Sequence, residues 1–426
     1  MIIVVGIDHH TAPVEVREQL ALTTAQLPVV LARLIEGPDA PLREAVVLAT
    51  CNRVEVYGAA DAEDDHTLHA LVEQVIGVLH AYHGLSSDAY ASLFYHYHGA
   101  AAVAHLFAAT AGLRSMVVGE AQIQGQVRAA QQAASEAGAS GPVLQALFRH
   151  ALETGKRIRT ETGIDRNAVS VSQAGVALAR QRLGSLAAAR VLLVGSGKMS
   201  ELAAKNLLDN GARSITLVNR SSERARQLAA VWGGVVRAFE DLPAALCEAD
   251  VVISSTAAPH PVIQAAHVQA AVVGRQTPLV LIDLAVPRDI AADVVDIAGA
   301  EVYNIDDLEQ VVVTNVARRQ GEIAAAQAII AGEVVRFEGW LQARAVLPAL
   351  TGLRAHAEAI RRDELAKALH RLGPLDDRER QIVEALSQSI VNKLLHQPTV
   401  RLKDEAARGN GGHYAQALQT LFGLGE

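Results

Sequence analysis

One of the two cysteines of this chain lies in the stretch VVLATCNRVEVYG, at a polar turn between two apolar runs. Thr50 precedes Cys51, and Asn52 and Arg53 follow it. A free cysteine is usually a small buried hydrophobe, and we expect that role for Cys247 in PAALCEAD. An adjacent arginine, however, favours the thiolate and lowers the pKa of a thiol below about 8.5. Cys51 is therefore predicted to be a nucleophile.

A glycine pattern typical of dinucleotide binding follows the apolar strand RVLLV directly. Its first glycine permits a tight turn, and its second lets the backbone approach a pyrophosphate at the N-terminus of the next helix. The third position is a serine, which is still small enough for close packing of helix and strand. The predicted cofactor-binding residues of this loop are Gly195, Ser196, Gly197, Lys198, Met199 and Ser200. The alternative is a structural turn that binds nothing.

The next predicted strand ends in Asn219, Arg220 and Ser221, at about the distance where NAD-binding domains carry an acid for the ribose 2′-hydroxyl. No acid is present there, and Arg220 suits a 2′-phosphate, so NADPH is predicted over NADH. A thiolate beside a nicotinamide suggests a specific chemistry. The thiolate attacks an activated acyl group, the alcohol leaves, and hydride reduces the thioester to an aldehyde.

The N-terminal part, residues 1–160, is expected to be an α+β catalytic and substrate-binding domain. Its predicted strands are MIIVVGID, EAVVLAT and RVEVYGA, the last with period-2 alternation. A Thr23-x-x-Gln26 capping box is predicted to open the helix in TTAQLPVVLARLIEG. Further helices are expected at about 66–83, 100–110, 117–137 and 142–161.

Two further domains complete a predicted multidomain α/β fold. Residues 165–305 alternate helices with the apolar strands RVLLVG, SITLVN, DVVISST and LVLIDLAV, typical of a doubly wound, Rossmann-type parallel sheet. Residues 306–426 are expected to hold a long spinal helix and a helical dimerisation domain. Because no proline intervenes from Ile305 to Pro348, one helix of about 40 residues is predicted there. Helices at about 350–372 and 376–396 should follow it.

The composition restricts the class of protein. The chain has 426 residues, of which 50% are hydrophobic and 20% charged, as expected of globular domains. Its net charge of −8 argues against broad nonspecific binding of nucleic acid. Two distant cysteines form neither a disulfide framework nor a zinc site, which fits a reducing cytosol. No signal peptide or membrane span is apparent, so a cytoplasmic location without membrane contact is expected.

Taken in order, several segments resemble glutamyl-tRNA reductase over about residues 1–345: LATCNRVEVYG, AVAHLFAATAGLRSMVVGEAQIQGQV, LLVGSGKMSELA, VNRSSERA, ISSTAAPHPVI, LIDLAVPRDI and YNIDDLE. The resemblance implies NADPH-dependent reduction of glutamyl-tRNA to glutamate-1-semialdehyde, an early step of tetrapyrrole (porphyrin and heme) biosynthesis. It also implies a homodimer joined through the C-terminal helical domain. A glutamate-1-semialdehyde aminotransferase is a candidate partner on which the sequence does not decide.

The resemblance also implies roles for individual residues. It makes Cys51 the nucleophile, gives His105 a part in activity, and assigns the loop from Gly195 to Ser200 to NADPH. Where the family usually has G-L-D-S-M, this chain has Arg114 in place of the acid. The implied substrate-binding residues are Thr50, Cys51, Asn52, Arg53, Ser115, Glu120, Ala121, Gln122 and Gln126.

A substrate with an α-ammonium and a γ-carboxylate needs both signs of charge in its pocket. We expect Arg53 to meet the carboxylate and Glu120 the ammonium, although the reverse assignment stays open. His105 could protonate the departing ribose hydroxyl or the forming aldehyde oxygen, or it could be structural. The histidines of Asp8-His9-His10 and of FYHYH lack a compact set of further ligands, so no metal is predicted.

Two alternative functions stay open on the sequence alone. The chain could be an NADP-dependent dehydrogenase of a small free metabolite in which Cys51 is structural. It could also be a nucleotide-regulated scaffold or tRNA-binding module without catalysis. In the favoured interpretation the nucleotide-binding domain must close onto the thioester, because hydride transfer requires contact of the reacting atoms. Hinges are expected near residues 163–167 and 304–307.

Overall fold

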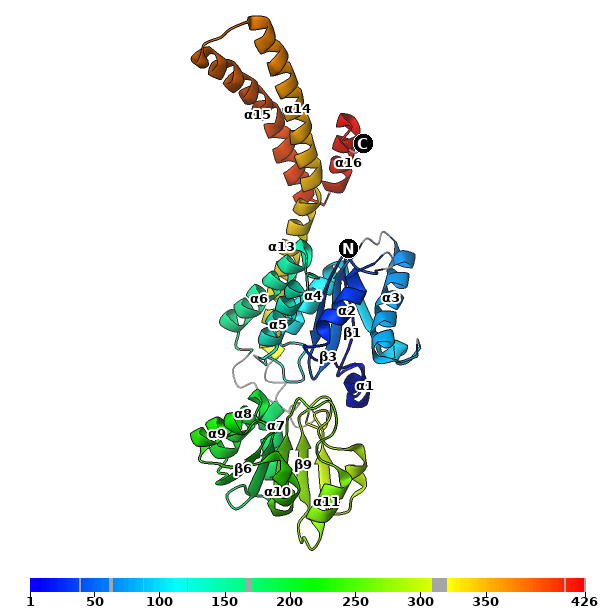
Figure 1. Ribbon diagram of the computed structural model, residues 1–426, viewed down its shortest axis with the longest axis vertical. Helices are drawn as coiled ribbons and strands as arrows, with labels where there is room; N and C mark the ends of the chain where they lie inside the picture. Colours follow the sequence, from blue (N-terminus) through cyan, green and yellow to red (C-terminus); the bar gives the residue numbers. More distant parts are fainter. Residues whose placement is uncertain are drawn as a thin grey trace. The chain divides into compact units, whose positions relative to one another are not determined.

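The computed structural model describes residues 1–37, 40–60, 64–86, 88–120, 122–164, 171–308, 320–409 and 411–424. They form two compact units, Met1–Ile330 and Ala331–Glu426. The first unit contains two sheets, one antiparallel and one parallel, and the second is helical (Figure 1). This confirms the predicted multidomain α/β fold class. The predicted domain boundaries stay a prediction.

A four-stranded antiparallel sheet of order β2-β3-β1-β4 lies at the centre of residues 1–164, which we call the antiparallel-sheet domain. Three of its strands were predicted, and the short edge strand β4 was not. Every residue of β1 is buried, and so is every residue of β3 except the last, because helices cover both faces of the sheet. The strands are β1 (Ile2–Asp8), β2 (Glu44–Ala49), β3 (Arg53–Ala59) and β4 (Tyr95–His98).

The described part of this domain has six α-helices, and two of them begin later than predicted. α2 begins at Leu27, and the Oε1 atom of Gln26 accepts hydrogen bonds from the backbone and hydroxyl of Thr23, so this contact forms one turn before the helix. α5 begins at Gln122 because the preceding loop turns at Gly112 and Gly119, both with positive φ. The helices are α1 (Val14–Gln19), α2 (Leu27–Ile35), α3 (Asp65–His83), α4 (Gly99–Thr110), α5 (Gln122–Glu136) and α6 (Pro142–Glu161).

A six-stranded sheet of order β10-β9-β8-β5-β6-β7 lies within residues 171–308, which we call the parallel-sheet domain. All of its pairings are parallel, and the order reverses between β5 and β8, as in a doubly wound sheet. Four strands were predicted, whereas the short edge strands β7 and β10 were not. The strands are β5 (Arg190–Val194), β6 (Ser214–Val218), β7 (Val235–Arg237), β8 (Val251–Ser254), β9 (Leu279–Asp283) and β10 (Ala300–Tyr303).

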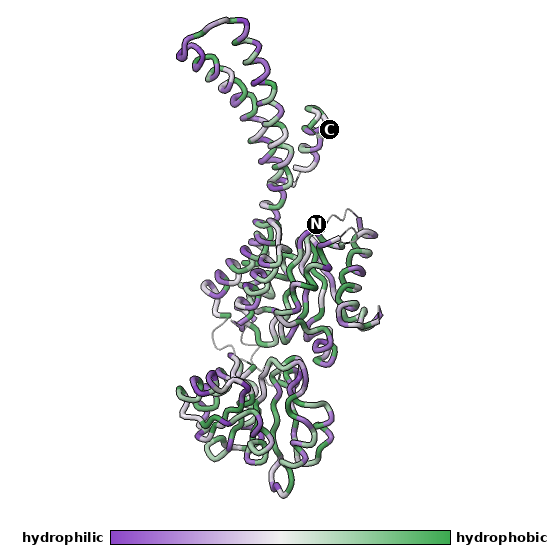
Figure 2. Tube along the Cα trace, viewed as in Figure 1, coloured by the Kyte–Doolittle hydropathy of each residue, from purple (hydrophilic) through white to green (hydrophobic). Residues whose placement is uncertain are grey.

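Helices pack on both faces of the parallel sheet, in two separate buried apolar clusters. They are α7 (Val171–Leu183), α8 (Lys198–Asp209), α9 (Ser222–Trp232), α10 (Leu242–Glu248) and α11 (Ala265–Val272). Ligands of such sheets bind beyond the carboxyl ends of the strands, at the point where the order reverses. The glycine loop after β5 lies at this point. Figure 2 shows that the apolar residues concentrate in the strands of both sheets.

The C-terminal helices differ from the prediction at the start. Residues 305–308 form a turn rather than a helix, because the side chain of Asn304 accepts the amides of Asp306 and Asp307 at 2.8 and 3.2 Å. Val312 and Val316, which the predicted helix included, lie outside the described residues. The chain also leaves the helix at Val346, before Pro348. The helices are α13 (Gln320–Ala345), α14 (Leu347–Leu372), α15 (Asp377–Ala407) and α16 (Gly411–Phe422).

Helix α15 carries an exposed apolar row. Its members recur every fourth residue, so they share one face of the helix. Each is more than half exposed: Ile382, Leu386, Ile390 and Leu394. The polar and apolar residues of α14 and α15 alternate along their length in Figure 2. Among the described residues, no helix combines the length and the apolar character needed to cross a membrane.

Candidate active site around Cys51

The turn that carries Cys51 is held by its own backbone and by Thr50. The Thr50 hydroxyl oxygen accepts the amides of Asn52 and Arg53 at 3.1 and 3.2 Å, and the Thr50 amide donates to the Arg53 carbonyl at 2.9 Å. Because β2 and β3 pair on either side, this short turn places the partly exposed Cys51 at the end of the antiparallel sheet.

A cavity of about 30 Å³ adjoins the thiol. It brings together every described residue of the predicted substrate-binding set, from the Cys51 turn, the loop before α5 and α5 itself. Ala121, the remaining member, lies outside the described residues. Two lining residues, Ile123 and Val171, were not predicted, and Met199 comes from the glycine loop. The lining residues are Thr50, Cys51, Asn52, Arg53, Ser115, Glu120, Gln122, Ile123, Gln126, Val171 and Met199.

Burial, and after it the Glu120 carboxylate, raise the pKa of the Cys51 thiol to about 11, although Arg17 and Arg53 act in the opposite direction. The predicted lowering of this pKa is therefore wrong for the protein without substrate. The physical reason is burial of the thiol, which outweighs the lowering effect of Arg53, itself paired with other groups. Its Nη1 atom donates to Glu55 Oε1 at 2.6 Å, and its Nη2 atom donates to the Arg114 carbonyl.

Glu55 is fully buried and is the centre of a polar network that includes Arg53 of the Cys51 turn. Besides Arg53, its carboxylate accepts the hydroxyls of Tyr57 at 2.7 Å and Tyr95 at 2.5 Å, and it lies 2.8 Å from His105 Nε2. Burial alone would raise the pKa of Glu55, but Arg53, His105 and these hydrogen bonds hold it well below its usual range. The network fixes the side chain of Arg53 at the cavity.

His105 lies in this network and does not line the cavity. It is 2% exposed in α4, and its Nδ1 atom has no hydrogen-bond partner among the described residues. The Arg114 guanidinium lies over the ring of Tyr97, 5.7 Å from its centroid, while the Arg114 carbonyl holds Arg53. Arg114 thus contacts the Arg53 side chain through its backbone carbonyl, while its own side chain lies against Tyr97.

The glycine loop after β5 has the shape that a dinucleotide requires. Gly195 has φ +103°, and a Cβ atom there would lie 2.3 Å from the Ser255 carbonyl oxygen, so only glycine fits. A Cβ atom on Gly197 would meet only that oxygen, at 3.9 Å, which leaves open space in front of the backbone. No side chain caps the N-terminus of α8, so its amides can bind phosphate oxygens. Ser200 is buried, as expected for packing of helix on strand.

The residues after β6 form a turn that presents the cationic side chain of Arg220 just before α9. The Asn219 side chain donates to the Ser221 carbonyl at 3.0 Å, which shapes the turn into α9. Arg220 stacks over Phe239, 5.3 Å from the ring centroid. A stacked guanidinium keeps its in-plane donors for an anion.

The three consecutive residues Asp8, His9 and His10 bring one potential metal-ligating atom each within 4.8 Å of one another. One Asp8 oxygen already accepts the His10 amide at 3.0 Å, and burial lowers the pKa of His9 to about 3. His96 and His98 of β4 do not join this group. The prediction that the chain holds no metal stays a prediction.

Comparisons with known proteins agree with this arrangement along the chain. Family models match in succession: the N-terminal domain of glutamyl-tRNAGlu reductase at residues 5–162, shikimate/quinate 5-dehydrogenase at 177–311, and the glutamyl-tRNAGlu reductase dimerisation domain at 325–424. The dehydrogenase match supports a nicotinamide cofactor.

Individual relatives cover nearly the whole chain. The glutamyl-tRNA reductase of Chloroflexus aurantiacus is 48% identical, with 98% of each chain covered, and that of Geobacter sulfurreducens is 42% identical, with 99% of this chain and 96% of the relative covered. The solved structure of the Methanopyrus kandleri enzyme is 33% identical, with a TM-score of 0.51 and 98% of each chain covered. The chain belongs to the glutamyl-tRNA reductase family.

Proposed function

We propose that Cys51 performs the reduction of glutamyl-tRNA by covalent catalysis. Its thiolate attacks the ester carbonyl carbon, the bond to the ribose oxygen breaks, and the tRNA leaves with its hydroxyl restored by a proton. NADPH, which the loop of Gly195 and Gly197 and the side chain of Arg220 would hold, would supply a hydride to the thioester carbon. The carbon–sulfur bond then breaks, which releases glutamate-1-semialdehyde and regenerates the Cys51 thiolate. The cavity that joins Cys51 to Met199 of the glycine loop is the observation that supports this proposal.

The lining residues suggest how the glutamyl group is oriented. Glu120 offers the negative charge for the α-ammonium, and Arg53 lines the same cavity with its side chain held by Glu55. The Asn52 side-chain oxygen is buried without a partner among the described residues, so it can accept an N–H of the substrate. NADPH is proposed because Arg220 stands where an acid would select NADH. His105 acts indirectly, through Glu55 on Arg53, since it does not reach the cavity.

The substrate itself would help to generate the thiolate. The Glu120 carboxylate raises the pKa of Cys51, and an α-ammonium placed against Glu120 would offset that charge. We therefore expect the Glu120→Gln variant to have a lower Cys51 pKa than the wild-type protein, because the uncharged amide no longer opposes the thiolate. Alkylation of Cys51 by iodoacetamide, followed from pH 7 to pH 10, should be faster in the variant than in the wild type at each pH. Its turnover of glutamyl-tRNA should nevertheless fall, since the ammonium loses its partner. An unchanged alkylation profile would show that Glu120 does not act on the thiol.

A thioester trap tests the proposed reaction. The protein is incubated with tRNA charged with labelled glutamate, without NADPH, and is quenched in acid. Label on the peptide that carries Cys51, released as aldehyde when NADPH is added before quenching, is the expected result. An unlabelled protein that still binds NADPH would instead favour a dehydrogenase of a small metabolite.

The exposed apolar row of α15 is proposed as part of a homodimer surface, in agreement with the dimerisation-domain match at 325–424. An aspartate within an apolar interface has no compensating partner, so Ile390→Asp should weaken dimerisation roughly 100-fold or more. Sedimentation velocity over a concentration series measures the change. Val231→Asp is the matched control, because Val231 is exposed to 78% but lies in α9. A variant that sediments like this control would remove α15 from the interface.

A further inference from the structure

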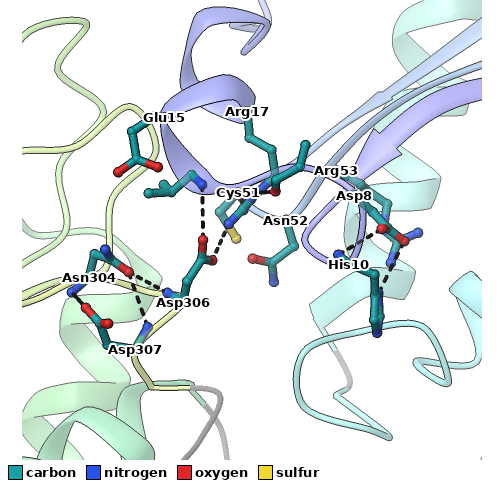
Figure 3. Close-up of polar contacts among 12 residues, drawn as sticks. Asp8, His10, Glu15, Arg17, Cys51, Asn52, Arg53, Asn304, Asp306 and Asp307 are labelled. Carbon is teal, nitrogen blue, oxygen red and sulfur yellow. Dashed lines mark hydrogen bonds and ion pairs between the residues drawn. The ribbon is translucent and has the colours of Figure 1, made fainter. Parts of the chain in front are cut away.

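Arg17 connects Cys51 to the parallel-sheet domain. It lies in α1, is 1% exposed, and places its guanidinium between the Cys51 turn and Asp306 (Figure 3). Its Nη1 atom donates to the Cys51 carbonyl, and its Nη2 atom donates to Asp306 Oδ1. Its Nε atom donates to the Ala12 carbonyl at 3.1 Å. Since the guanidinium is a rigid planar fork, displacing one acceptor changes its hold on the others.

Asp306 reaches α1 from the parallel-sheet domain. It lies in the turn that follows β10, and Asn304 fixes that turn by accepting two of its amides. The second oxygen of Asp306 accepts the amide of Val14, the first residue of α1, at 3.0 Å. One carboxylate therefore holds both the start of α1 and the arginine that contacts the nucleophile's backbone.

Other contacts hold the same surfaces together. Arg288, in the loop after β9, pairs with Glu18 at 2.8 and 3.0 Å and with Glu15 at 3.0 Å, both in α1. Val14 is also buried in one apolar cluster with Val171 and Leu308 of the parallel-sheet domain. The antiparallel-sheet domain is thus docked on its neighbour through apolar contacts and the ion pairs of Arg17 and Arg288.

In this docked arrangement the cavity beside Cys51 has room for roughly one or two water molecules. A glutamyl group is several times larger. Val171 and Met199, which close the cavity from the parallel-sheet side, must therefore withdraw before acylation and return before hydride transfer. The contacts of Arg17 and Arg288 belong to the returned, docked state.

We propose that Arg17 is a positioning residue that couples docking of the parallel-sheet domain to the placement of Cys51, through its simultaneous hydrogen bonds to the Cys51 carbonyl and the Asp306 carboxylate. This inference rests on the proposed thioester mechanism. In the undocked state Arg17 still holds the Cys51 turn for acylation. On docking, Asp306 binds the same guanidinium, so the domain that carries the cofactor comes to rest only where the nucleophile is held.

Single-turnover experiments separate the two steps. Acylation is followed as label transferred from glutamyl-tRNA to Cys51 without NADPH, and reduction as release of that label after NADPH is added. Asp306→Asn removes the charge that docking requires but leaves the contact of Arg17 with Cys51. We expect acylation within about twofold of wild type and reduction slowed roughly tenfold. Arg17→Lys keeps the charge but has one nitrogen for two acceptors, so both steps should slow roughly tenfold.

Asp307→Asn is the matched control, since Asp307 lies in the same turn and accepts the Asn304 amide at 2.8 Å without any contact to Arg17 among the described residues. Both of its steps should stay within about twofold of wild type. An Asp306→Asn variant that behaves like this control, or that loses both steps equally, would overturn the inference. So would normal acylation by Arg17→Lys. If Arg17→Lys does not fold, the comparison of Asp306→Asn with Asp307→Asn still tests the inference. A wild-type protein that acquires no label would instead refute the thioester mechanism.

Discussion

Replacing Cys51 with serine is expected to lower the turnover of glutamyl-tRNA by roughly three orders of magnitude or more, because an alcohol is a far weaker nucleophile than a thiolate and a far poorer leaving group in the reduction step. The thiol and hydroxyl groups are close in size. The Cys51 side chain does not hold the turn, because the hydrogen bonds of the turn come from Thr50 and the backbone. The loss should therefore fall on the rate and leave NADPH binding, measured by fluorescence titration, as in the wild type.

Cys247→Ser provides the matched control for this experiment. Cys247, which was expected to be buried, is instead exposed in α10, within the parallel-sheet domain, and it does not line the Cys51 cavity. Its variant should turn over glutamyl-tRNA at the wild-type rate. If Cys51→Ser retains most of its activity, Cys51 is structural and the proposed mechanism fails, whatever the thiol's reactivity toward alkylating agents.

Glu55→Gln should destabilise the antiparallel-sheet domain by about 3–5 kcal/mol, because removing one member of a buried ion pair leaves the other charge uncompensated. Arg53 is 1% exposed and would lose its carboxylate partner, and the amide would present its own N–H groups to the donors of Tyr57 and Tyr95. Both tryptophans lie outside residues 1–164, so tryptophan fluorescence would not report on unfolding of this domain. Its stability is instead measured by hydrogen exchange of the β1 and β3 amides across a urea series.

The pH dependence of this effect has a definite sign. The pKa of Glu55 is lower in the folded protein, so its stabilisation is fully present above the pKa of an unfolded glutamate, about 4.3, and is lost as the pH falls below it. The difference between wild type and Glu55→Gln should shrink accordingly. Glu161→Gln, which removes an exposed partner of Arg157, should leave the urea midpoint unchanged. Equal effects of the two substitutions would show that the Glu55 network adds nothing to stability.

Much of this architecture could be predicted because it is encoded locally. The apolar runs of β5, β6, β8 and β9 identify a parallel sheet, and the glycines after β5 mark its phosphate loop. The turn around Cys51 follows from two strands with polar residues between them. The resemblance to the family then brought the loop before α5 and the residues of α5 to the same cavity, which no spacing rule could have done.

The remainder depends on contacts that no local pattern records. The alternation of RVEVYGA places Arg53, Glu55 and Tyr57 on one face of β3, but it does not reveal that helices cover this face too. For the same reason the predicted net lowering of the Cys51 pKa was wrong, although Arg53 itself acts in the lowering direction, because burial of the thiol outweighs it. Arg17 and Asp306 are separated by 289 positions, and although Asp306 stands in the YNIDDLE segment, nothing in that segment predicts its pairing with Arg17. The apolar spacing from Ile305 onward predicted a helix, but the side chain of Asn304 holds residues 305–308 in a turn.

The small size of the cavity beside Cys51 affects how much of the thioester is reduced rather than hydrolysed. An acyl group on sulfur can be captured by water, which would return free glutamate and waste the energy stored in the charged tRNA. With Val171 and Met199 in place, the cavity beside the thiol is only about 30 Å³, which restricts the water that can lie near an acyl carbon. The yield of aldehyde per tRNA consumed is therefore set by a kinetic competition between hydrolysis in the undocked state and closure of the domains. A mutation that only prolongs the undocked state lowers this yield before it lowers the rate at which tRNA is consumed.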